Sequence, residues 1–186
     1  MKTPNFTNHF LIAMPNMADS FFAKSLVYVC EHSEKGALGI IVNRPTEVVM
    51  GKLFDQLNIP LQNADKYDAQ IFMGGPMHTD RGFVLHQPIG AWSSSLIINA
   101  DFALTTSKDV LQAVAHGAGP TRLLVCLGYA GWDAGQLEDE IGENAWLTVS
   151  ANADVIFNHA PRDRVTAAMG MLGFNPAALH GEAGHA

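Results

Sequence analysis

Residues 26–42 read LVYVCEHSEKGALGIIV and contain two apolar runs on either side of a short polar segment. The runs are Leu26–Cys30 and Leu38–Val42, and both are rich in β-branched side chains, which favour strands. The residues between them include Glu-Lys-Gly at 34–36, which is turn chemistry. Two such runs separated by a glycine-containing turn predict a β-hairpin, so we expect antiparallel β-structure here.

Outward from the hairpin, six further segments predict strands. Each is short and largely apolar, and together they mix β-branched and aromatic side chains. The segments are Phe10–Ala13, Gln70–Met73, Phe83–His86, Leu96–Ile98, Leu123–Leu127 and Trp146–Val149.

Four other segments predict helices, because their apolar residues recur every three or four positions. Ser107 is expected to cap one of these helices and Gly117 to end it. Asp133 and Gln136 have the spacing of a capping box at the start of another. The four segments are Gly51–Leu57, Lys108–His116, the helix that follows Asp133, and Arg162–Leu172.

The order of these elements predicts the fold class. Strands come in hairpin-like groups with helices placed irregularly between them, which favours an α+β fold over an α/β fold. The chain has 186 residues, with 48% hydrophobic and 16% charged residues, values typical of a globular protein. No repeat or flexible linker divides it, so we expect a single compact domain over residues 1–186.

Composition argues against several classes of protein. The formal net charge is -7, from 11 Lys+Arg and 18 Asp+Glu, which disfavours direct binding to nucleic acid or to an anionic membrane. No apolar run approaches the ~18 residues of a membrane span. The two cysteines do not suggest a disulfide framework. We expect a cytoplasmic protein that does not associate with membranes.

Standard catalytic and metal-binding signatures are absent. The sequence contains no P-loop, no nucleophile elbow, and no pair of histidines four residues apart among its eight. Cys30 and His32 share one face of a predicted strand, but two ligands do not hold a metal. We therefore expect neither a metal nor a cofactor.

Two glycine-rich turns suggest a site. Gly74 and Gly75 follow one predicted strand, and Gly128 follows another. Glycine permits positive φ or a close backbone approach, either to a ligand or to another strand. We expect the loops Gly74–Gly82 and Gly128–Gln136 to line one cleft for a small anionic or planar ligand or an extended peptide. The candidate ligand-binding residues are Asn43, Arg44, Gly74, Gly75, Arg81, Tyr129, Trp132 and Gln136.

These turns belong to a series of motifs that runs along essentially the whole chain. The motifs are Leu11–Pro15, Asp19, Phe22, Tyr28–His32, Gly36–Gly39, Asn43–Pro45, Gly74–Pro76, Arg81–His86, Gly128–Trp132, Gly135–Glu138 and Ala183–Ala186. In this series the sequence resembles the YqgE/AlgH family of bacterial proteins. Where the resemblance leads us to expect an Arg-Trp pair near the start of the last helix, this chain has Arg164-Val165.

The resemblance implies a compact α+β fold with a coiled, partly barrel-like mixed β-sheet flanked by helices. Family members are described as proposed regulators of transcription associated with alginate production. The resemblance brings with it no established catalytic residue and no cofactor.

Three functions stay open on this basis. The first is a non-enzymatic binding or indirect regulatory protein whose partner is an unknown small ligand or protein. The second is an enzyme that uses His86 or a carboxylate such as Glu138 as acid or base in a glycine-loop cleft. The third is a redox sensor that works through Cys30 or Cys126, although apolar surroundings favour inert thiols.

The charge balance generates a prediction about DNA. The purified protein should not retain an operator-length duplex in a mobility-shift assay, because few cations are available to displace counterions from phosphates. Tight retention that weakens steeply with added salt would contradict this and support direct regulation.

Overall fold

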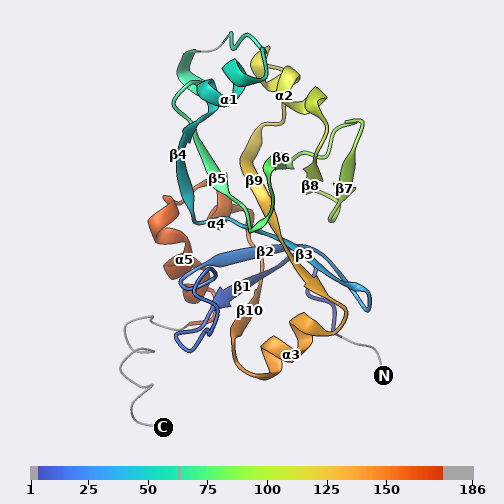
Figure 1. Cartoon of the computed structure of the whole chain (residues 1–186), viewed down its shortest axis with the longest axis vertical. Coiled ribbons are helices and arrows are strands. Elements are labelled where there is room, and N and C mark those ends of the chain that lie inside the picture. Colours follow the sequence, from blue (N-terminus) through green and yellow to red (C-terminus); the bar gives the residue numbers. More distant parts are fainter. Residues whose placement is uncertain (1–3, 63, 174–186) are drawn as a thin grey trace. The chain divides into compact units, whose positions relative to one another are not determined.

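The computed structural model describes residues 4–62 and 64–173, which form ten strands, five α-helices and two short 3₁₀ helices (Figure 1). The family-like stretch Ala183–Ala186 lies outside the described residues. The chain divides into two compact units. The first unit contains residues 1–43 and 131–186, and the second contains residues 44–130. The single-domain organisation expected from the sequence stays a prediction.

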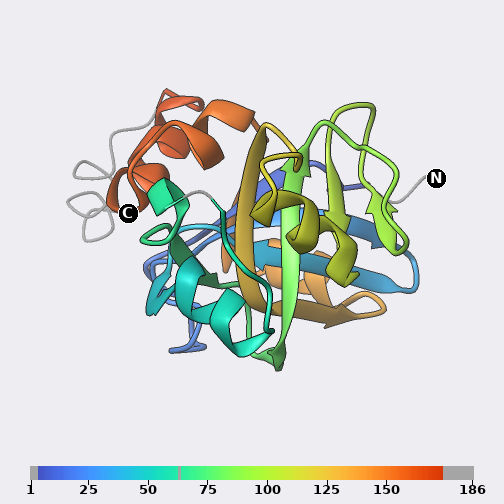
Figure 2. The same ribbon diagram turned by 90° about the horizontal axis from the view of Figure 1, so that it is seen from above.

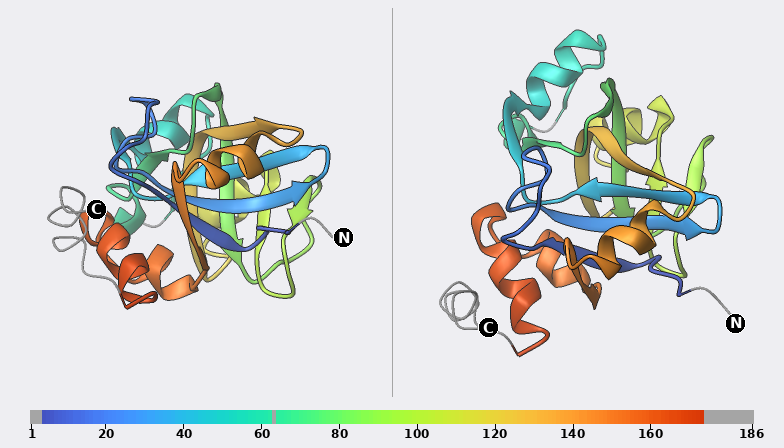
Figure 3. Two further views of the ribbon diagram at one scale, coloured as in Figure 1. Left: turned by 90° about the horizontal axis from the view of Figure 1, so that it is seen from below. Right: turned by 60° about the horizontal axis from the view of Figure 1, so that its bottom comes forward.

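The first unit is built on the predicted hairpin. Strand β2 (Leu26–Ser33) pairs antiparallel with β3 (Gly36–Ile41), and β1 (His9–Ala13) lies between β2 and β10 (Trp146–Ser150) in the order β10-β1-β2-β3. Figure 3 shows β1, β2 and β3 side by side. All five residues of the run Leu26–Cys30 are buried, as expected for a strand covered on both faces.

Three α-helices complete the first unit. They are α3 (Gln136–Gly142), α4 (Ala153–Phe157) and α5 (Arg164–Gly170), which follows the 3₁₀ helix η2 (Pro161–Asp163). Helix α5 packs against β1, and α3 contacts β3 and β10.

Of the two hydrogen bonds of the capping box predicted at Asp133, the bond from the N-cap side chain is wrong, because Asp133 is not the N-cap residue. Helix α3 begins after Gly135, whose left-handed backbone (φ 78°) occupies the N-cap position, and Asp133 ends strand β9. The other bond is present, because the Gln136 side-chain oxygen accepts a hydrogen bond from the Asp133 N–H at 2.9 Å. A glycine turn between strand and helix moves the helix start two residues beyond the predicted N-cap.

The second unit contains a mixed sheet. Strands β9 (Arg122–Asp133), β6 (Met77–Gln87), β8 (Ala103–Thr105) and β7 (Ser95–Ile97) pair antiparallel in that order, and the last three residues of β9 belong to the first unit. Strand β5 (Gln70–Met73) pairs parallel with β9 and antiparallel with β4 (Pro45–Val49).

Helices α1 (Met50–Gln56) and α2 (Lys108–Ala115) cover this sheet, and the 3₁₀ helix η1 spans Ala64–Lys66. Figure 2 shows α2 lying over β6 and β9. Phe54 of α1, Val110 and Val114 of α2, and Ile71 of β5 are fully buried in one apolar cluster. Helical spacing of apolar residues therefore places one face of each helix on the sheet.

The predicted fold class, α+β, is confirmed, and the parallel pairing of β5 with β9 makes the sheet mixed. Every predicted strand and helix has a counterpart. Strands β4 and β8 and helix α4, each of at most five residues, were missed.

The glycines of the two predicted loops have a packing role. A Cβ on Gly75 would lie 2.0 Å from the Tyr129 carbonyl carbon, and one on Gly74 would lie 2.4 Å from the Gly128 carbonyl oxygen. These backbones approach one another too closely for any side chain. The sequence left open whether these glycines allow close approach to a ligand or to another strand. The structure shows close approach to another strand.

This close approach predicts a selective loss of stability. Gly75→Ala should reduce the free energy of unfolding by about 3 kcal/mol, since the added methyl meets backbone that cannot move aside. The matched control is Gly82→Ala on β6, where a Cβ would meet nothing within 4 Å. Calorimetric melting should separate the two variants, and equal melting temperatures would contradict the packing role.

Candidate functional site

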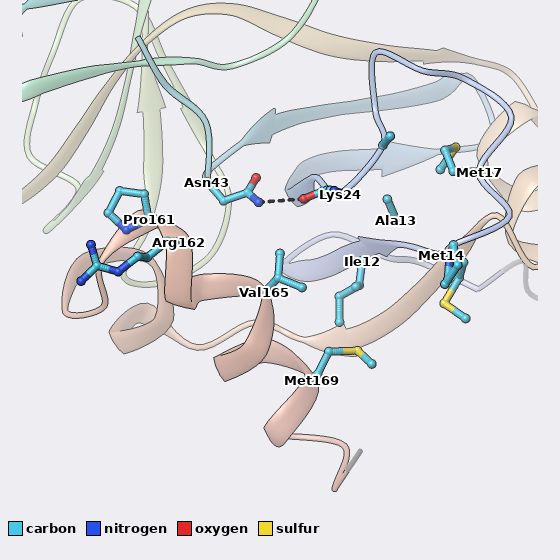
Figure 4. Close-up of a pocket in the computed structure, with 12 residues that line it drawn as sticks. Ile12, Ala13, Met14, Met17, Lys24, Asn43, Pro161, Arg162, Val165 and Met169 are labelled. Atoms are coloured by element: carbon cyan, nitrogen blue, oxygen red, sulfur yellow. Dashed lines mark hydrogen bonds between the residues drawn. The ribbon is translucent and has the colours of Figure 1, made fainter. Parts of the chain in front are cut away.

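The first unit contains a cavity of about 460 Å³, a size typical of small-molecule sites. Its walls come from β1, from the loop that joins β1 to β2, from Asn43 just beyond the end of β3, and from η2 and α5 (Figure 4). The twelve lining residues are Ile12, Ala13, Met14, Pro15, Met17, Ala23, Lys24, Asn43, Pro161, Arg162, Val165 and Met169.

Apolar side chains form most of the lining. In Figure 4, Val165 and Met169 project from α5 toward Ile12 of β1. Three of the lining residues are methionines, whose flexible thioethers adapt to ligands of different shape. The polar side chains are Lys24, Asn43 and Arg162, and the lining includes no carboxylate, histidine, serine or cysteine.

One wall is the loop of residues 14–25, called the wall loop below. Its two ends are held together because the Ala13 N–H donates to the Ser25 carbonyl at 3.1 Å. At its start the Met14 N–H donates to the Ala145 carbonyl at 3.0 Å. Further along, the Asp19 carboxylate accepts from the Phe21 N–H at 2.8 Å, which closes a turn. The wall loop thus has a defined conformation although it contains no helix or strand.

Asn43 fixes the end of the wall loop. Its side-chain nitrogen donates to the Lys24 carbonyl, and its side-chain oxygen accepts from the Leu26 N–H, both at 2.9 Å. This one amide therefore links the residues on either side of Ser25 to the segment that follows β3. Asn43, a candidate binding residue from the sequence, lines the cavity and positions its wall.

An aromatic cluster holds the middle of the wall loop. The Phe22 ring stacks on Trp132 with centroids 6.1 Å apart and meets Trp146 edge-on at 5.7 Å. Both indole N–H groups donate to one oxygen of Glu140, at 3.0 Å from Trp132 and 2.9 Å from Trp146. Gln136 donates to the other Glu140 oxygen at 2.9 Å.

Trp132 and Gln136 therefore lie outside the cavity lining and support it indirectly. Gln136 orients Glu140, Glu140 fixes both indoles, and the indoles pack against Phe22 of the wall loop. Sequence reasoning missed Glu140, because a glutamate on an acidic helix reads as a solvated residue. The sequence pointed to such an acceptor only indirectly, through two tryptophans whose indole N–H groups each need a hydrogen-bond partner when buried.

The remaining candidates lie in the second unit. A β-bulge separates the pairs Met77↔Tyr129 and Gly82↔Leu127, and Arg81 belongs to this bulge. The Arg81 guanidinium carbon lies 6.0 Å from the centroid of the Phe83 ring, and Phe83 meets Tyr129 edge-on at 5.5 Å. Gly74 and Gly75 pack beside Gly128 and Tyr129 as described above.

Arg44 begins the second unit. It is half-buried, and burial lowers the pKa of its guanidinium from the usual range. Its carbonyl accepts from the Met73 N–H at 2.8 Å. Trp132 and Gln136 belong to the first unit and Arg81 and Tyr129 to the second, so their common cleft stays a prediction.

The two candidate acid–base residues are engaged in hydrogen bonds. One ring nitrogen of His86 lies 2.9 Å from the Pro88 carbonyl and the other lies 2.6 Å from the Thr105 hydroxyl. Burial lowers the His86 pKa, against the opposing effect of the Pro88 bond. Glu138 lies 3.0 Å from His32, and although burial alone would raise the Glu138 pKa, bonding to His32 and to backbone lowers it below the usual range.

Cys30 and Cys126 are 1% and 0% exposed and lie in different units, which leaves little thiol surface for a redox reaction. Within residues 4–62 and 64–173, no three His, Cys, Asp or Glu side chains gather at a metal-binding distance. The expectation of a metal-free protein stays a prediction. None of the helices in the described part of the chain is long and apolar enough to span a membrane.

Known proteins resemble this chain over its whole length. The model of the AlgH-like family matches residues 10–177. A UPF0301 protein of Chromobacterium violaceum is 54% identical over 186 residues, which cover 100% of both chains. A UPF0301 protein of Ralstonia pickettii is 55% identical over 182 residues, which cover 98% of this chain and 96% of the relative.

Two solved structures share the fold. The solution structure of the AlgH protein from Pseudomonas aeruginosa matches with a TM-score of 0.82 and 45% identity over 100% of both chains. A crystal structure of a Corynebacterium diphtheriae protein matches with a TM-score of 0.65 over 88% of this chain and 84% of that one. At 20% identity, this second match shows a common fold alone.

The shared Glu140 oxygen predicts a large effect from a single change. Glu140→Ala should lower the free energy of unfolding by about 3 kcal/mol, because two buried indole N–H groups lose their acceptor. Glu143→Ala, an exposed position just after α3, is the matched control and should change stability by less than about 0.5 kcal/mol. Urea unfolding followed by tryptophan fluorescence measures both, and similar midpoints would disprove the role of Glu140.

Proposed function

This chain belongs to the AlgH-like family, and on that premise we propose that it is a binding protein that holds a small, largely apolar molecule in the cavity of its first unit. The observation that carries the proposal is the cavity itself, with its methionine-rich lining between β1 and α5. A concave, mostly apolar pocket of this size with a few polar groups at its edge is typical of small-molecule sites.

The magnitude of the driving force suits reversible binding. A ligand that buries ~200 Å² of apolar surface gains about 5 kcal/mol at roughly 25 cal/mol per Å². Part of this gain offsets the loss of translational and rotational freedom. The remainder, which is below about 5 kcal/mol, corresponds to dissociation constants of roughly millimolar or weaker, so binding is readily reversible.

The lining supports binding over catalysis. General acid–base or nucleophilic catalysis needs a titratable group or nucleophile within hydrogen-bond reach of the reacting atom. Of the polar lining residues, Asn43 is engaged with the Lys24 carbonyl and the Leu26 N–H, and Lys24 and Arg162 are cations. The alternative acid–base residues His86 and Glu138 are not among the lining residues.

A regulatory role would act through occupancy of the cavity. Part of the cavity wall is the wall loop, so a bound ligand contacts a surface segment that a protein partner can recognise. An acidic chain with 18 Asp+Glu and 11 Lys+Arg is poorly suited to read DNA itself. We therefore propose that any influence on transcription is indirect and takes place in the cytoplasm.

The proposal is tested by locating an apolar probe. Decanol, added to protein with ¹³C-labelled methionine methyl groups, should shift the signals of Met14, Met17 and Met169. The signals of Met50 and Met77, which belong to the second unit, should stay in place. Shifts spread evenly over all methionine methyls would point to non-specific contact and contradict the proposal.

A cavity-filling substitution provides the matched test. Val165→Trp adds a large ring on the cavity side of α5 and should weaken decanol binding by more than about tenfold, because the ring takes the place of the ligand. Thr166→Trp places the same side chain at the next, exposed position of α5 and should bind decanol normally. Unchanged binding by a folded Val165→Trp protein would overturn the proposal.

A further inference from the structure

The charged residues of the cavity lining are positive, whereas the whole chain has a net negative charge. The chain has 18 acidic and 11 basic residues, yet the lining residues include two cations, Lys24 and Arg162, and no acid. The acids nearest to them along the sequence, Asp19 and Asp163, are not lining residues. A lining that is positive in an acidic protein selects for negative charge in the ligand.

Both cations sit where they can remain in water. Lys24 and Arg162 are exposed, and in Figure 4 the Arg162 guanidinium extends away from the apolar side chains of the lining. The deeper lining residues, among them Ile12 and Met169, are buried. An ionised group is strongly disfavoured among apolar side chains. A ligand with one charged end therefore binds with its tail inward and its charge at the opening.

The chain fixes the backbone that carries each cation. The buried Arg164 side chain donates to the carbonyls of Val42 and His159, which anchors the turn that presents Arg162. Lys24 adopts positive φ (64°), a conformation uncommon for a residue other than glycine, and its carbonyl is held by Asn43. A strained backbone persists where surrounding contacts determine it, and functional sites often contain such residues.

We propose that the ligand of this cavity is a medium-length alkyl carboxylate, with its hydrocarbon tail among the methionines and its carboxylate at the opening, on the side of the exposed cations Lys24 and Arg162. This inference rests on the proposed function and adds the chemical class of the ligand. The planar guanidinium of Arg162 suits a carboxylate, to which it can donate two hydrogen bonds. The tail supplies affinity, and the two exposed cations supply selectivity.

The test compares ligands that differ only in the head group. Decanoate, decanol and decyltrimethylammonium, each kept below its micelle concentration, are titrated into the protein and followed by the methionine methyl signals. Decanoate should bind more tightly than decanol, and the ammonium compound should bind most weakly. Across hexanoate, octanoate and decanoate, affinity should rise by about fourfold per added methylene until the cavity is filled.

Charge variants test the two cations directly. The double variant Lys24→Gln/Arg162→Gln should bind decanoate about tenfold more weakly, as expected for two exposed ion pairs, and bind decanol as the parent protein does. Lys35→Gln, in the hairpin turn of the same unit, removes an exposed cation outside the lining and should change neither affinity.

The outcomes separate the two proposals. Equal binding of decanoate and decanol, or tighter binding of the ammonium compound, would overturn the carboxylate inference and leave the apolar binding function standing. If neither decanoate nor decanol shifts Met14, Met17 or Met169, both proposals fail. A double variant that loses decanol and decanoate equally would show that Lys24 and Arg162 serve the shape of the cavity, which also overturns the charge argument.

Discussion

Two buried indoles share one carboxylate oxygen, and the first unit depends on this arrangement. Trp132 and Trp146 are 6% and 3% exposed, and a buried indole N–H without an acceptor is costly. Glu140 satisfies both at once, which fixes the end of β9 relative to β10 and to α3. The rings then form the surface against which Phe22 packs. The need of two buried indole N–H groups for an acceptor thus determines the path of a loop that has no regular secondary structure.

The cavity follows from that constraint. The wall loop is held in the middle by Phe22 and at its end by Asn43, and it is not free to collapse onto α5. Small side chains at Ala13, Ala23 and Val165 leave the space between the two walls unfilled. Binding capacity in this unit thus results from rigid surroundings combined with small residues, and the methionines supply an adaptable apolar part of the lining.

Charge and shape act on different parts of a ligand in this arrangement. Burial of an apolar tail against the walls contributes affinity whatever the head group is, whereas the cations at the opening distinguish one head group from another. The candidates in the second unit contribute in another way. There, glycines allow two strands to approach closely, and exposed Arg81 lies beside buried Phe83, which contacts Tyr129 next to a β-bulge. The structure therefore gives the glycines of these turns a largely architectural role in that unit.

The sequence by itself determined the hairpin over residues 26–42, the α+β class and most helices and strands, because these depend on local periodicity and turn chemistry. It also singled out Asn43, Trp132 and Gln136, since polar and aromatic residues beside glycine turns are visible along the chain. It did not indicate the cavity, whose lining joins Ile12, Lys24 and Val165 from distant segments. Only the tertiary structure brings such segments together, and an apolar residue beside a cavity has the same sequence pattern as one in a filled core.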